Sequence, residues 1–289
     1  MADRYDVCVI GSANLDLVAT TSHLPQPGET VLGRGYAEHP GGKGLNQAVS
    51  ASRSGARTAF VGALGSDPAG ARLRAVLTNE MIDATAVTLV EAPTGRALII
   101  VDDAGENSIV VIPGANATVS TVVELPSASV VLAQLEIPID AVVAALTNAR
   151  SVGSTVILNP APAAPLPPEL LAVCDVLVPN QHELVQLGGV RSMLEAGCGA
   201  VVATLGSAGA DVHTAAGTTR VAAFDVDVVD TTGAGDAFCG ALAARLAAND
   251  DLLEAVRWAT AAGALATTVR GAVPAQPTAN AIKALLRRA

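Results

Sequence analysis

The chain has 289 residues, a length that fits one large α/β domain with a small appendage. Although 51% of the residues are apolar, Gly, Pro and charged residues interrupt the apolar runs, so we expect no membrane-spanning segment. The net charge of −10 argues against a general nucleic-acid surface, which needs clustered Lys and Arg.

The start of the chain lacks the basic residues and the apolar run of an export signal, which favours a location in the cytoplasm. The four cysteines are far apart and form no CxxC pair, and the four histidines are scattered. We therefore predict no zinc site, no redox motif and no transition-metal site built by the protein.

Strand-like apolar runs alternate with helix-compatible stretches along most of the chain. This alternation predicts an α/β fold with a doubly wound, mostly parallel sheet and helices on both faces. The predicted strands are Val7–Ser12, Thr58–Ala63, Ser129–Gln134, Thr155–Asn159, Val176–Pro179, Ala200–Leu205 and Val221–Val229. The predicted helices are Lys43–Ser54, Ala69–Asn79, Ile139–Arg150, Asn180–Leu187, Ser192–Ala196, Gly235–Ala248, Leu252–Thr268 and Thr278–Arg288.

Two regions, 16–38 and 95–112, break this alternation. In the second region, Arg96–Val101 and Asn107–Ile112 flank a polar turn segment, which predicts a β-hairpin. We expect the two regions to form a small β-sheet lid that closes over a substrate and excludes water. The α/β core is then expected at residues 1–15, 39–94 and 113–289.

Polar residues follow the predicted strands at the place where doubly wound sheets bind their ligands, beyond the carboxyl ends of the strands. The sequence therefore predicts one crevice at this edge of the sheet. The polar residues are Asn14 and Asp16 after the first strand, then Glu136, Asn159, Asn180 and residues 204–209 after later strands.

The segment Asp230–Phe238 places two glycines and a carboxylate between a predicted strand and a predicted helix. The first N–H groups of a helix lack partners and the helix dipole adds positive potential, so an anion is stabilised there. A carboxylate at Asp236 suits such a place if it accepts a proton from an attacking hydroxyl, which favours phosphoryl transfer to an alcohol. An ordinary turn, with Asp236 favoured by the helix dipole, explains the same residues.

The segment Gly41–Asn46 opens another predicted helix, where glycines permit close approach to a ligand. Alone, it is equally compatible with a glycine turn that carries a solvated lysine. Together with Gly11–Asp16 and Asp230–Asp236, it resembles the PfkB family of carbohydrate kinases, and the Gly-Gly-Lys-Gly-x-Asn form is most similar to the ribokinase branch. The resemblance extends from about Val7 to Ala284, with the motifs in the family's order.

This resemblance implies that Asp236 is the base that deprotonates the accepting hydroxyl, and that Gly233, Ala234 and Gly235 form the anion hole. Carboxylates and amides suit the recognition of sugar hydroxyls, although Asp16 or Glu136 taken singly is also explained as a solvated loop carboxylate. The implied sugar-binding residues are Asn14, Asp16, Gly42, Lys43, Asn46 and Glu136.

The resemblance also implies MgATP and a potassium ion. Glu183 would order magnesium-bound water, although Asn180 and Glu183 also fit a helix capping box, and residues 204–209 also fit a strand-turn-strand. The implied nucleotide-binding residues are Asn180, Thr204, Gly206, Gly209 and Gly235. The implied potassium loop contains Asp230 and Thr232, with main-chain carbonyls around Ala266, Val269 and Gly271.

Three features depart from the ribokinase pattern: a short segment between Glu183 and Val201, Thr260 in place of an asparagine near the nucleotide, and Ala275 in place of a serine beside the potassium site. These departures leave the strength of nucleotide and cation binding open.

The reaction that the resemblance implies is transfer of the γ-phosphoryl of MgATP to the 5-hydroxyl of D-ribose, in a homodimer paired through the lid. Alternative substrates are 2-deoxyribose, fructose, another sugar, or a nucleoside such as adenosine. A non-catalytic sugar or nucleotide sensor is the alternative of another class. A Rossmann dehydrogenase is disfavoured, because Gly11–Asp16 lacks the GxGxxG turn after the first strand.

Overall fold

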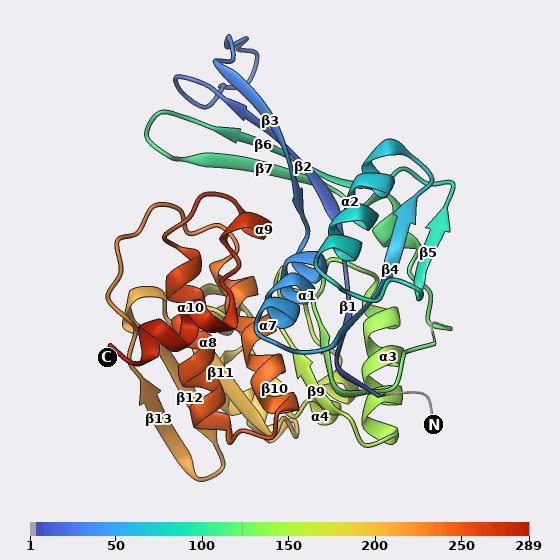
Figure 1. The fold of residues 1–289 in the computed structure, drawn as a ribbon, viewed down its shortest axis with the longest axis vertical. Coiled ribbons are helices and arrows are strands. Elements are labelled where there is room, and N and C mark those ends of the chain that lie inside the picture. Colours follow the sequence, from blue (N-terminus) through green and yellow to red (C-terminus); the bar gives the residue numbers. More distant parts are fainter. Residues whose placement is uncertain (1–3, 123, 289) are drawn as a thin grey trace.

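The computed structural model describes residues 4–122 and 124–288; residues 1–3, 123 and 289 of the predicted core lie outside the described part. Its largest element is a nine-stranded sheet with the order β13-β12-β11-β10-β9-β8-β1-β4-β5 (Figure 1). Neighbouring strands from β5 to β11 pair in parallel, and β12 and β13 add an antiparallel hairpin at one edge. The predicted doubly wound, mostly parallel sheet is confirmed.

The strands of this sheet include every strand predicted for the core up to residue 205, together with β5, β12 and β13, which the sequence analysis did not predict. Their bounds are β1 (Tyr5–Ile10), β4 (Thr58–Gly65), β5 (Val87–Val90), β8 (Ala128–Ala133), β9 (Thr155–Leu158), β10 (Val176–Leu177), β11 (Ala200–Thr204), β12 (Ala210–Thr214) and β13 (Gly217–Val221).

The predicted strand Val221–Val229 is wrong, because only Val221 belongs to a strand and residues 222–229 join no ladder. β13 is the last strand of the sheet, so the chain leaves the ladder after Val221. The alternation of side chains has another origin here, since Phe224, Val226 and Val228 border a cleft instead of a sheet face.

Alternate side chains of the central strands pack on opposite faces of the sheet. In β1, Val7 and Val9 belong to one buried cluster, whereas Cys8 and Ile10 belong to the other. Burial on both faces explains why these strands read as continuous apolar runs. The first face is covered by α1 (Lys43–Arg53), α2 (Pro68–Asn79), α7 (Ala234–Ala247) and α8 (Leu252–Ala266), and the second by α3 (Ile139–Ser151), α4 (Pro168–Val173), α5 (Gln181–Gln186) and α6 (Gly189–Glu195).

Each predicted helix is present, with its ends moved by a few residues, and α4 is an addition. The C-terminal third also contains α9 (Ala272–Ala275), which was not predicted, and α10 (Ala279–Leu286), which packs on α8. Among the described residues, no helix has both the length and the apolar character to cross a membrane.

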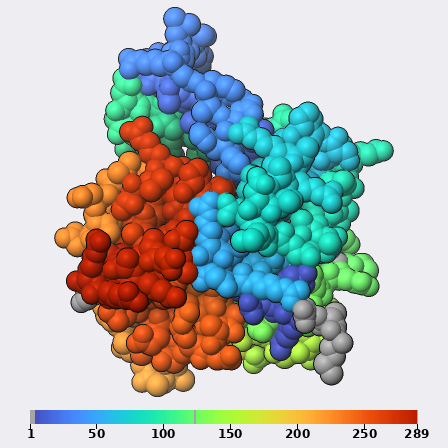
Figure 2. All heavy atoms as spheres, in the orientation of Figure 1, coloured from blue at the N-terminus to red at the C-terminus, as the bar shows by residue number. Residues whose placement is uncertain are grey.

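A second sheet, with the order β3-β2-β6-β7, projects from one end of the core (Figures 1 and 2). We call it the lid sheet; its strands are β2 (Asn14–Thr20), β3 (Gly35–Gly41), β6 (Gly95–Val101) and β7 (Asn107–Ile112). β6 and β7 form the predicted hairpin, and β2 pairs with β6 in parallel.

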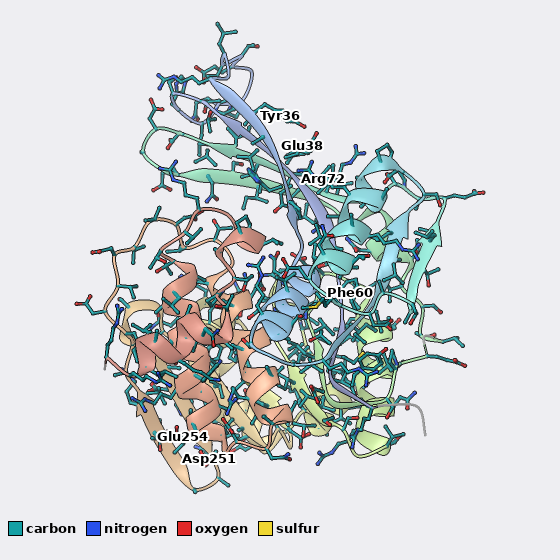
Figure 3. The ribbon with its side chains drawn as sticks, in the orientation of Figure 1. Tyr36, Glu38, Phe60, Arg72, Asp251 and Glu254 are labelled. Atoms are coloured by element: carbon teal, nitrogen blue, oxygen red, sulfur yellow. The ribbon has the colours of Figure 1, made fainter. Side chains whose placement is uncertain are left out.

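One exposed ion pair joins the lid sheet to the core. Nη1 of Arg72 in α2 lies 3.0 Å from Oε2 of Glu38 in β3, and Nη2 donates to the Glu38 carbonyl at 2.9 Å (Figure 3). The Tyr36 hydroxyl donates to the other carboxylate oxygen of Glu38 at 2.6 Å. Because both members of the pair are exposed, it orients the lid sheet more than it stabilises the protein.

Candidate active site

The first turn of α7 carries a buried carboxylate beside two glycines. Gly233 is the N-cap residue, and its φ of 76° lies in the left-handed region that favours glycine. A Cβ atom at Gly235 would meet no atom within 4 Å, so this residue faces open space. Asp236 follows directly and is 7% exposed. The helix start thus brings N–H groups that lack intrahelical partners and a carboxylate to the same open space, and the Ala234 N–H has a long bond of 3.3 Å to the Thr231 carbonyl.

Two amides from α1 hold the Asp236 carboxylate. Nδ2 of Asn46 donates to Oδ2 of Asp236, and Nε2 of Gln47 donates to Oδ1, each at 2.9 Å. The two oxygens of the carboxylate therefore have separate donors, and its plane is fixed. Oδ1 of Asn46 is buried and has no hydrogen-bond partner among the described residues, which leaves one acceptor available to a ligand hydroxyl.

Charge around Asp236 is only partly balanced. Burial raises the pKa of Asp236 above its ordinary value, and the Lys43 charge and the two amides oppose this shift. Burial also lowers the pKa of Lys43, but the carboxylates of Asp236, Glu136 and Glu183 outweigh it and leave that pKa raised. Lys43 is therefore a cation in a pocket that holds several carboxyl groups.

A second carboxylate, Glu136, lies on the α1 side of the pocket. Its Oε2 accepts from the Ser12 hydroxyl at 2.5 Å and from the Lys43 N–H at 3.1 Å. These contacts join the end of β1, the start of α1 and the loop after β8. Gly42, the N-cap residue of α1, has a φ of 91°, and a Cβ there would lie 2.7 Å from the Asn14 nitrogen. Glycine is therefore required sterically at position 42, which is one of the predicted sugar-binding positions.

A third carboxylate, Asp16, enters from the lid sheet. Its oxygens lie against Gly41, where a Cβ atom would approach to 2.1 Å. Burial and the carboxylates of Glu136 and Asp236 raise the pKa of Asp16 to about 7. Among the described residues, none donates a hydrogen bond to the Asp16 carboxylate, so it is available to a ligand.

Asn14 is oriented by a residue from beyond the lid sheet. Nδ2 of Asn116, in the 3-10 turn Gly114–Thr118, donates to Oδ1 of Asn14 at 2.7 Å. Oδ1 of Asn116 accepts from the Ala13 N–H at 3.0 Å, which fixes the Asn116 amide. The amide nitrogen of Asn14 is therefore directed away from Asn116, as a donor.

The pocket at Asp236 continues into a larger cleft. The smaller cavity, of about 120 Å³, is lined among others by Lys43, Asn159, Asn180, Glu183, Gly233 and Asp236. The larger cleft, of about 750 Å³, is lined among others by Gly206, Gly209, Phe238 and Thr260. Both cavities share Thr204 and Gly235, so the start of α7 lies where they meet. The Thr260 hydroxyl is bonded to the Val256 carbonyl of its own helix at 2.8 Å.

The capping-box interpretation of Asn180 and Glu183 is confirmed. Oδ1 of Asn180 accepts from the Glu183 N–H, and the Glu183 carboxylate accepts from the Asn180 N–H, both at 2.9 Å. Partial burial nevertheless raises the pKa of Glu183, because its carboxylate borders the cavity that contains Lys43 and Asp236. The cap therefore positions a carboxylate at the cavity wall.

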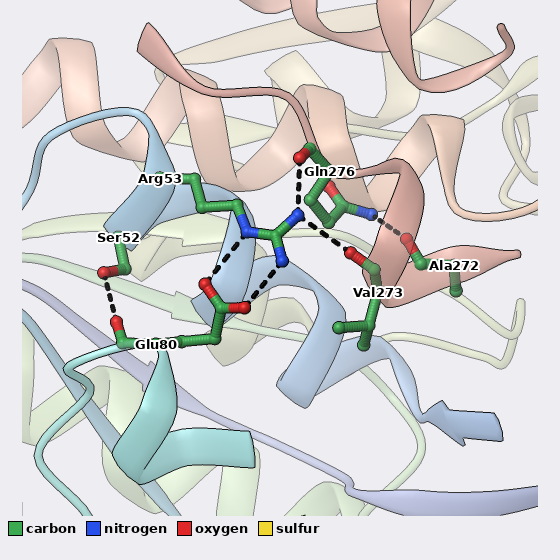
Figure 4. Close-up of polar contacts among 6 residues, drawn as sticks. All are labelled: Ser52, Arg53, Glu80, Ala272, Val273 and Gln276. Atoms are coloured by element: carbon green, nitrogen blue, oxygen red, sulfur yellow. Dashed lines mark hydrogen bonds and ion pairs between the residues drawn. The ribbon is translucent and has the colours of Figure 1, made fainter. Parts of the chain in front are cut away.

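Asp230 ties the loop before α7 to the loop before α9. Its Oδ1 accepts from the N–H and the hydroxyl of Thr232 at 2.9 and 2.6 Å, and its Oδ2 accepts from the Gly271 N–H at 2.8 Å. Partial burial raises the pKa of Asp230, but these hydrogen bonds outweigh it and hold the pKa below its usual value. The amide of Gln276 donates to the Gly233 carbonyl at 3.3 Å. It also donates to the Ala272 carbonyl at 3.0 Å (Figure 4).

The sequence analysis missed three side chains of this region: Gln47, Gln134 and Asn116. Each is polar yet buried, and the first two are fully excluded from solvent. Gln47 lies on the buried face of α1, beside Asn46, and polar residues on an apolar helix face were the available signal. Of the described residues, no three His, Cys, Asp or Glu side chains form a group that could hold a metal ion.

The nine-stranded core, the projecting sheet and the cleft at the start of α7 define the ribokinase-like class of α/β folds. The model of the pfkB family of carbohydrate kinases matches residues 4–279. The chain belongs to this family of carbohydrate kinases.

Three relatives illustrate the likeness. The chain is 37% identical to the ribokinase of Haemophilus influenzae over 294 residues, which cover 95% of this chain and 96% of that protein. The crystal structure of ribokinase from Thermotoga maritima aligns with a TM-score of 0.91 and 34% identity, covering 97% and 99% of the two chains. Arabidopsis thaliana ribokinase, in complex with ribose and ATP, aligns with a TM-score of 0.90 and 31% identity over 99% of each chain.

Proposed function

We propose that this chain is a ribokinase, which transfers the γ-phosphoryl group of MgATP to the 5-hydroxyl of D-ribose and gives D-ribose 5-phosphate. The observation that carries the proposal is the buried Asp236 carboxylate, held by Asn46 and Gln47 beside Gly235 at the junction of the two cavities. The likeness to ribokinases across nearly the whole chain supports the same reaction.

In the proposed reaction, Asp236 removes the proton of the attacking hydroxyl, whose oxygen then bonds to the terminal phosphorus while the bond to the ADP oxygen breaks. Negative charge grows on the transferred group, and the N–H groups of Gly233, Ala234 and Gly235 stabilise it. A buried carboxylate with a raised pKa is a stronger base than a solvated one, which suits this step.

We propose that the sugar lies between the lid sheet and α1, against Asn14, Asp16, Gly42, Lys43, Asn46 and Glu136. The free acceptors at Asp16 and Asn46 and the donors at Asn14 and Lys43 match a ligand with several hydroxyls. Three carboxyl groups around one pocket would repel an anionic ligand, so a neutral polyol is favoured.

The larger cleft is the proposed ATP site, with Asn180, Thr204, Gly206, Gly209 and Gly235 along the nucleotide. Its size fits a mononucleotide, and Phe238 with Val226 offers an apolar wall. Thr260 turns its hydroxyl back to its own helix, so it presents its methyl group rather than a polar contact to the base.

The residues present fit magnesium and potassium in different ways. Because Glu183 belongs to no group of three metal-binding side chains among the described residues, it suits an ion that keeps its waters and is bound mainly by phosphates. Asp230, Thr232 and the carbonyls of Ala266, Val269 and Gly271 would supply the oxygen ligands of potassium, and the Asp230 carboxylate accepts from both Thr232 and Gly271. Magnesium would neutralise phosphate charge, and potassium would order the loop that carries the anion hole.

We further propose that residues 16–38 and 95–112 act as the lid of a core formed by the remaining chain, and that two chains pair through it. Ile109, Val110, Val111 and Ile112 of the edge strand β7 are all at least 45% exposed, a surface that pairing would cover. Val111→Lys should give a monomer in light scattering, and Ser108→Lys should remain a dimer. Because the phosphate donor is ATP, the proposed location is the cytoplasm.

A panel of substrates tests the function. ADP release is measured with ribose, 2-deoxyribose, fructose and adenosine, each with and without potassium, and ribose should give the highest kcat/KM. If another member of the panel gives a higher kcat/KM than ribose, that compound is the substrate instead of ribose. Tight ribose binding without ADP release would favour a sensor.

A further inference from the structure

A chain of buried amides lies behind Asp236. Nε2 of Gln134, which follows β8, donates to Oε1 of Gln47 at 2.5 Å. Nε2 of Gln47 donates to Oδ1 of Asp236 at 2.9 Å and to Oδ1 of Asn159 at 3.0 Å. Gln47 and Gln134 are 0% exposed. Gln47 thereby uses both amide hydrogens and its oxygen within the protein.

The direction of each hydrogen bond among these buried amides follows from one backbone carbonyl. The Val178 carbonyl can only accept, so Nδ2 of Asn159 must face it, and they lie 2.9 Å apart. Oδ1 of Asn159 is then an acceptor and requires the NH₂ group of Gln47. Gln47 Oε1 must accordingly face Gln134, which donates to it. The amide of Gln47 cannot flip without the loss of three hydrogen bonds.

Close packing of α1 on α7 sets the reach of Gln47. A Cβ atom at Gly240 would lie 2.3 Å from the Gln47 carbonyl oxygen, so only glycine permits this approach. The Ser50 hydroxyl donates to the Ala237 carbonyl at 2.8 Å and locks the same contact one turn further on. Gln47 is thus held against Asp236 by both backbone and side-chain contacts.

We propose that Gln47 and Gln134 are positioning residues for the phosphoryl transfer: through this chain of amides they fix the plane of the Asp236 carboxylate and keep it aimed, as an acceptor, at the substrate hydroxyl. The inference rests on the role of Asp236 in the proposed function. Gln47 acts directly on the carboxylate, whereas Gln134 acts only through Gln47.

The charged surroundings of Asp236 make the contribution of Gln47 to the pKa of this carboxyl group measurable. Asp236 faces Lys43 from α1, Glu136 from the loop after β8, Asp16 from the lid sheet, Glu183 from α5 and the thiol of Cys239 from its own helix. Burial raises the pKa of Asp236, while Lys43 and the two amides lower it. Loss of the Gln47 donor removes one lowering contact, so the pKa rises further. Because the base must be ionised, activity should then begin at higher pH.

The test compares Gln47→Met and Gln134→Met, which keep side-chain length but remove the amide, with Gln186→Met on the exposed face of α5 as the control. Gln47→Met should lower kcat at least about tenfold and move the acidic limb of the kcat profile up by about one pH unit. Gln134→Met should shift the profile in the same direction by less, and the double variant should resemble Gln47→Met alone. KM for ATP should stay within about twofold of the parent.

Unfolding experiments without substrate show whether each variant is folded. They also distinguish failure of the positioning role from failure of the proposed function. Since the folded pKa of Asp236 is raised, ionisation destabilises the fold, and the free energy of unfolding falls as pH rises; Gln47→Met should extend this fall to higher pH. An unmoved acidic limb in a folded Gln47→Met or Gln134→Met protein would overturn the proposal. If the parent phosphorylates no sugar while the variants change only the pH dependence of unfolding, the proposed function fails and the amides are merely structural.

Discussion

Arg53 and Glu80 form a two-bonded ion pair that joins the end of α1 to the end of α2. Nε of Arg53 lies 2.9 Å from Oε2 of Glu80 and Nη2 lies 2.6 Å from Oε1 (Figure 4). Nη1 of the same guanidinium donates to the carbonyls of Val273 and Gln276 at 3.1 and 2.7 Å. One side chain therefore fixes α9, next to the proposed potassium loop, against two helices of the core.

We predict that Arg53→Met lowers the free energy of unfolding by about 3 kcal/mol, because it leaves the Glu80 carboxylate and two carbonyls without their shared donor. The side chains of the pair are only 23% and 20% exposed. Urea denaturation without ligands measures the change.

The exposed pair of Arg72 and Glu38 gives the matched control. With side chains that are 44% and 37% exposed, Arg72→Met should cost less than about 1 kcal/mol. Equal losses in the two variants would show that burial of the Arg53 pair contributes nothing.

Substitution of Gly235 should change turnover without lowering the stability of α7. A Cβ atom there meets nothing within 4 Å, so Gly235→Ala should leave the free energy of unfolding unchanged or raise it by up to about 1 kcal/mol. The added methyl group would occupy the point where the two cavities meet, so kcat should fall at least about tenfold. Unfolding curves and ATP turnover are measured on the same preparation.

Gly233→Ala, unlike Gly235→Ala, should lower the free energy of unfolding. Its φ of 76° disfavours a side chain, and a Cβ atom would lie 3.0 Å from Cα of Ala272. A destabilisation of about 1 kcal/mol or more is expected. A stable Gly233→Ala protein with full activity would contradict the proposed geometry of the anion hole.

The parallel core was predictable because its strands are buried on both faces and several of its helices begin at a capping side chain. β4 is buried at every position, and Asp251 caps α8 by accepting from the N–H groups of Leu253 and Glu254 (Figure 3). The hairpin β12–β13 was missed because β13 is exposed at four of its five positions and shows no apolar pattern. Local pattern carries less information at the edge of a sheet.

Sequence motifs also located Asp236 and its glycines, but they did not reveal what holds the carboxylate. Gln47 and Gln134 meet only because α7 packs on both α1 and β8, and the bond between them joins residues that are 87 positions apart. Such contacts depend on the three-dimensional arrangement of elements that a local pattern cannot specify. The capping box at Asn180, a purely local device, was predictable.

Asp16 offers a test in which stability and function oppose each other. Its pKa is raised to about 7, so the folded protein binds the proton more tightly than the unfolded chain, and the free energy of unfolding falls as pH rises from about 4 to 7. Asp16→Asn removes that loss and should raise the free energy of unfolding at pH 8 by on the order of 1 kcal/mol. Ribose binding, measured by calorimetry, should weaken at least about tenfold. The difference in free energy of unfolding between Asp16→Asn and the parent should be larger at pH 8 than at pH 4. An equal difference at the two pH values would contradict the unfavourable burial of this carboxylate.

Asp236→Asn tests the reacting centre itself. The amide keeps the shape of the carboxylate but cannot accept the proton of the attacking hydroxyl, so turnover with ribose should fall at least about 10²-fold, while ATP binding persists. In the parent enzyme, kcat should rise with pH through the raised pKa of Asp236, because only the ionised carboxylate is a base. In Asp236→Asn, this acidic limb should be absent from the residual activity. Near-normal turnover in a folded Asp236→Asn protein, or the same acidic limb without the carboxylate, would show that another group removes the proton.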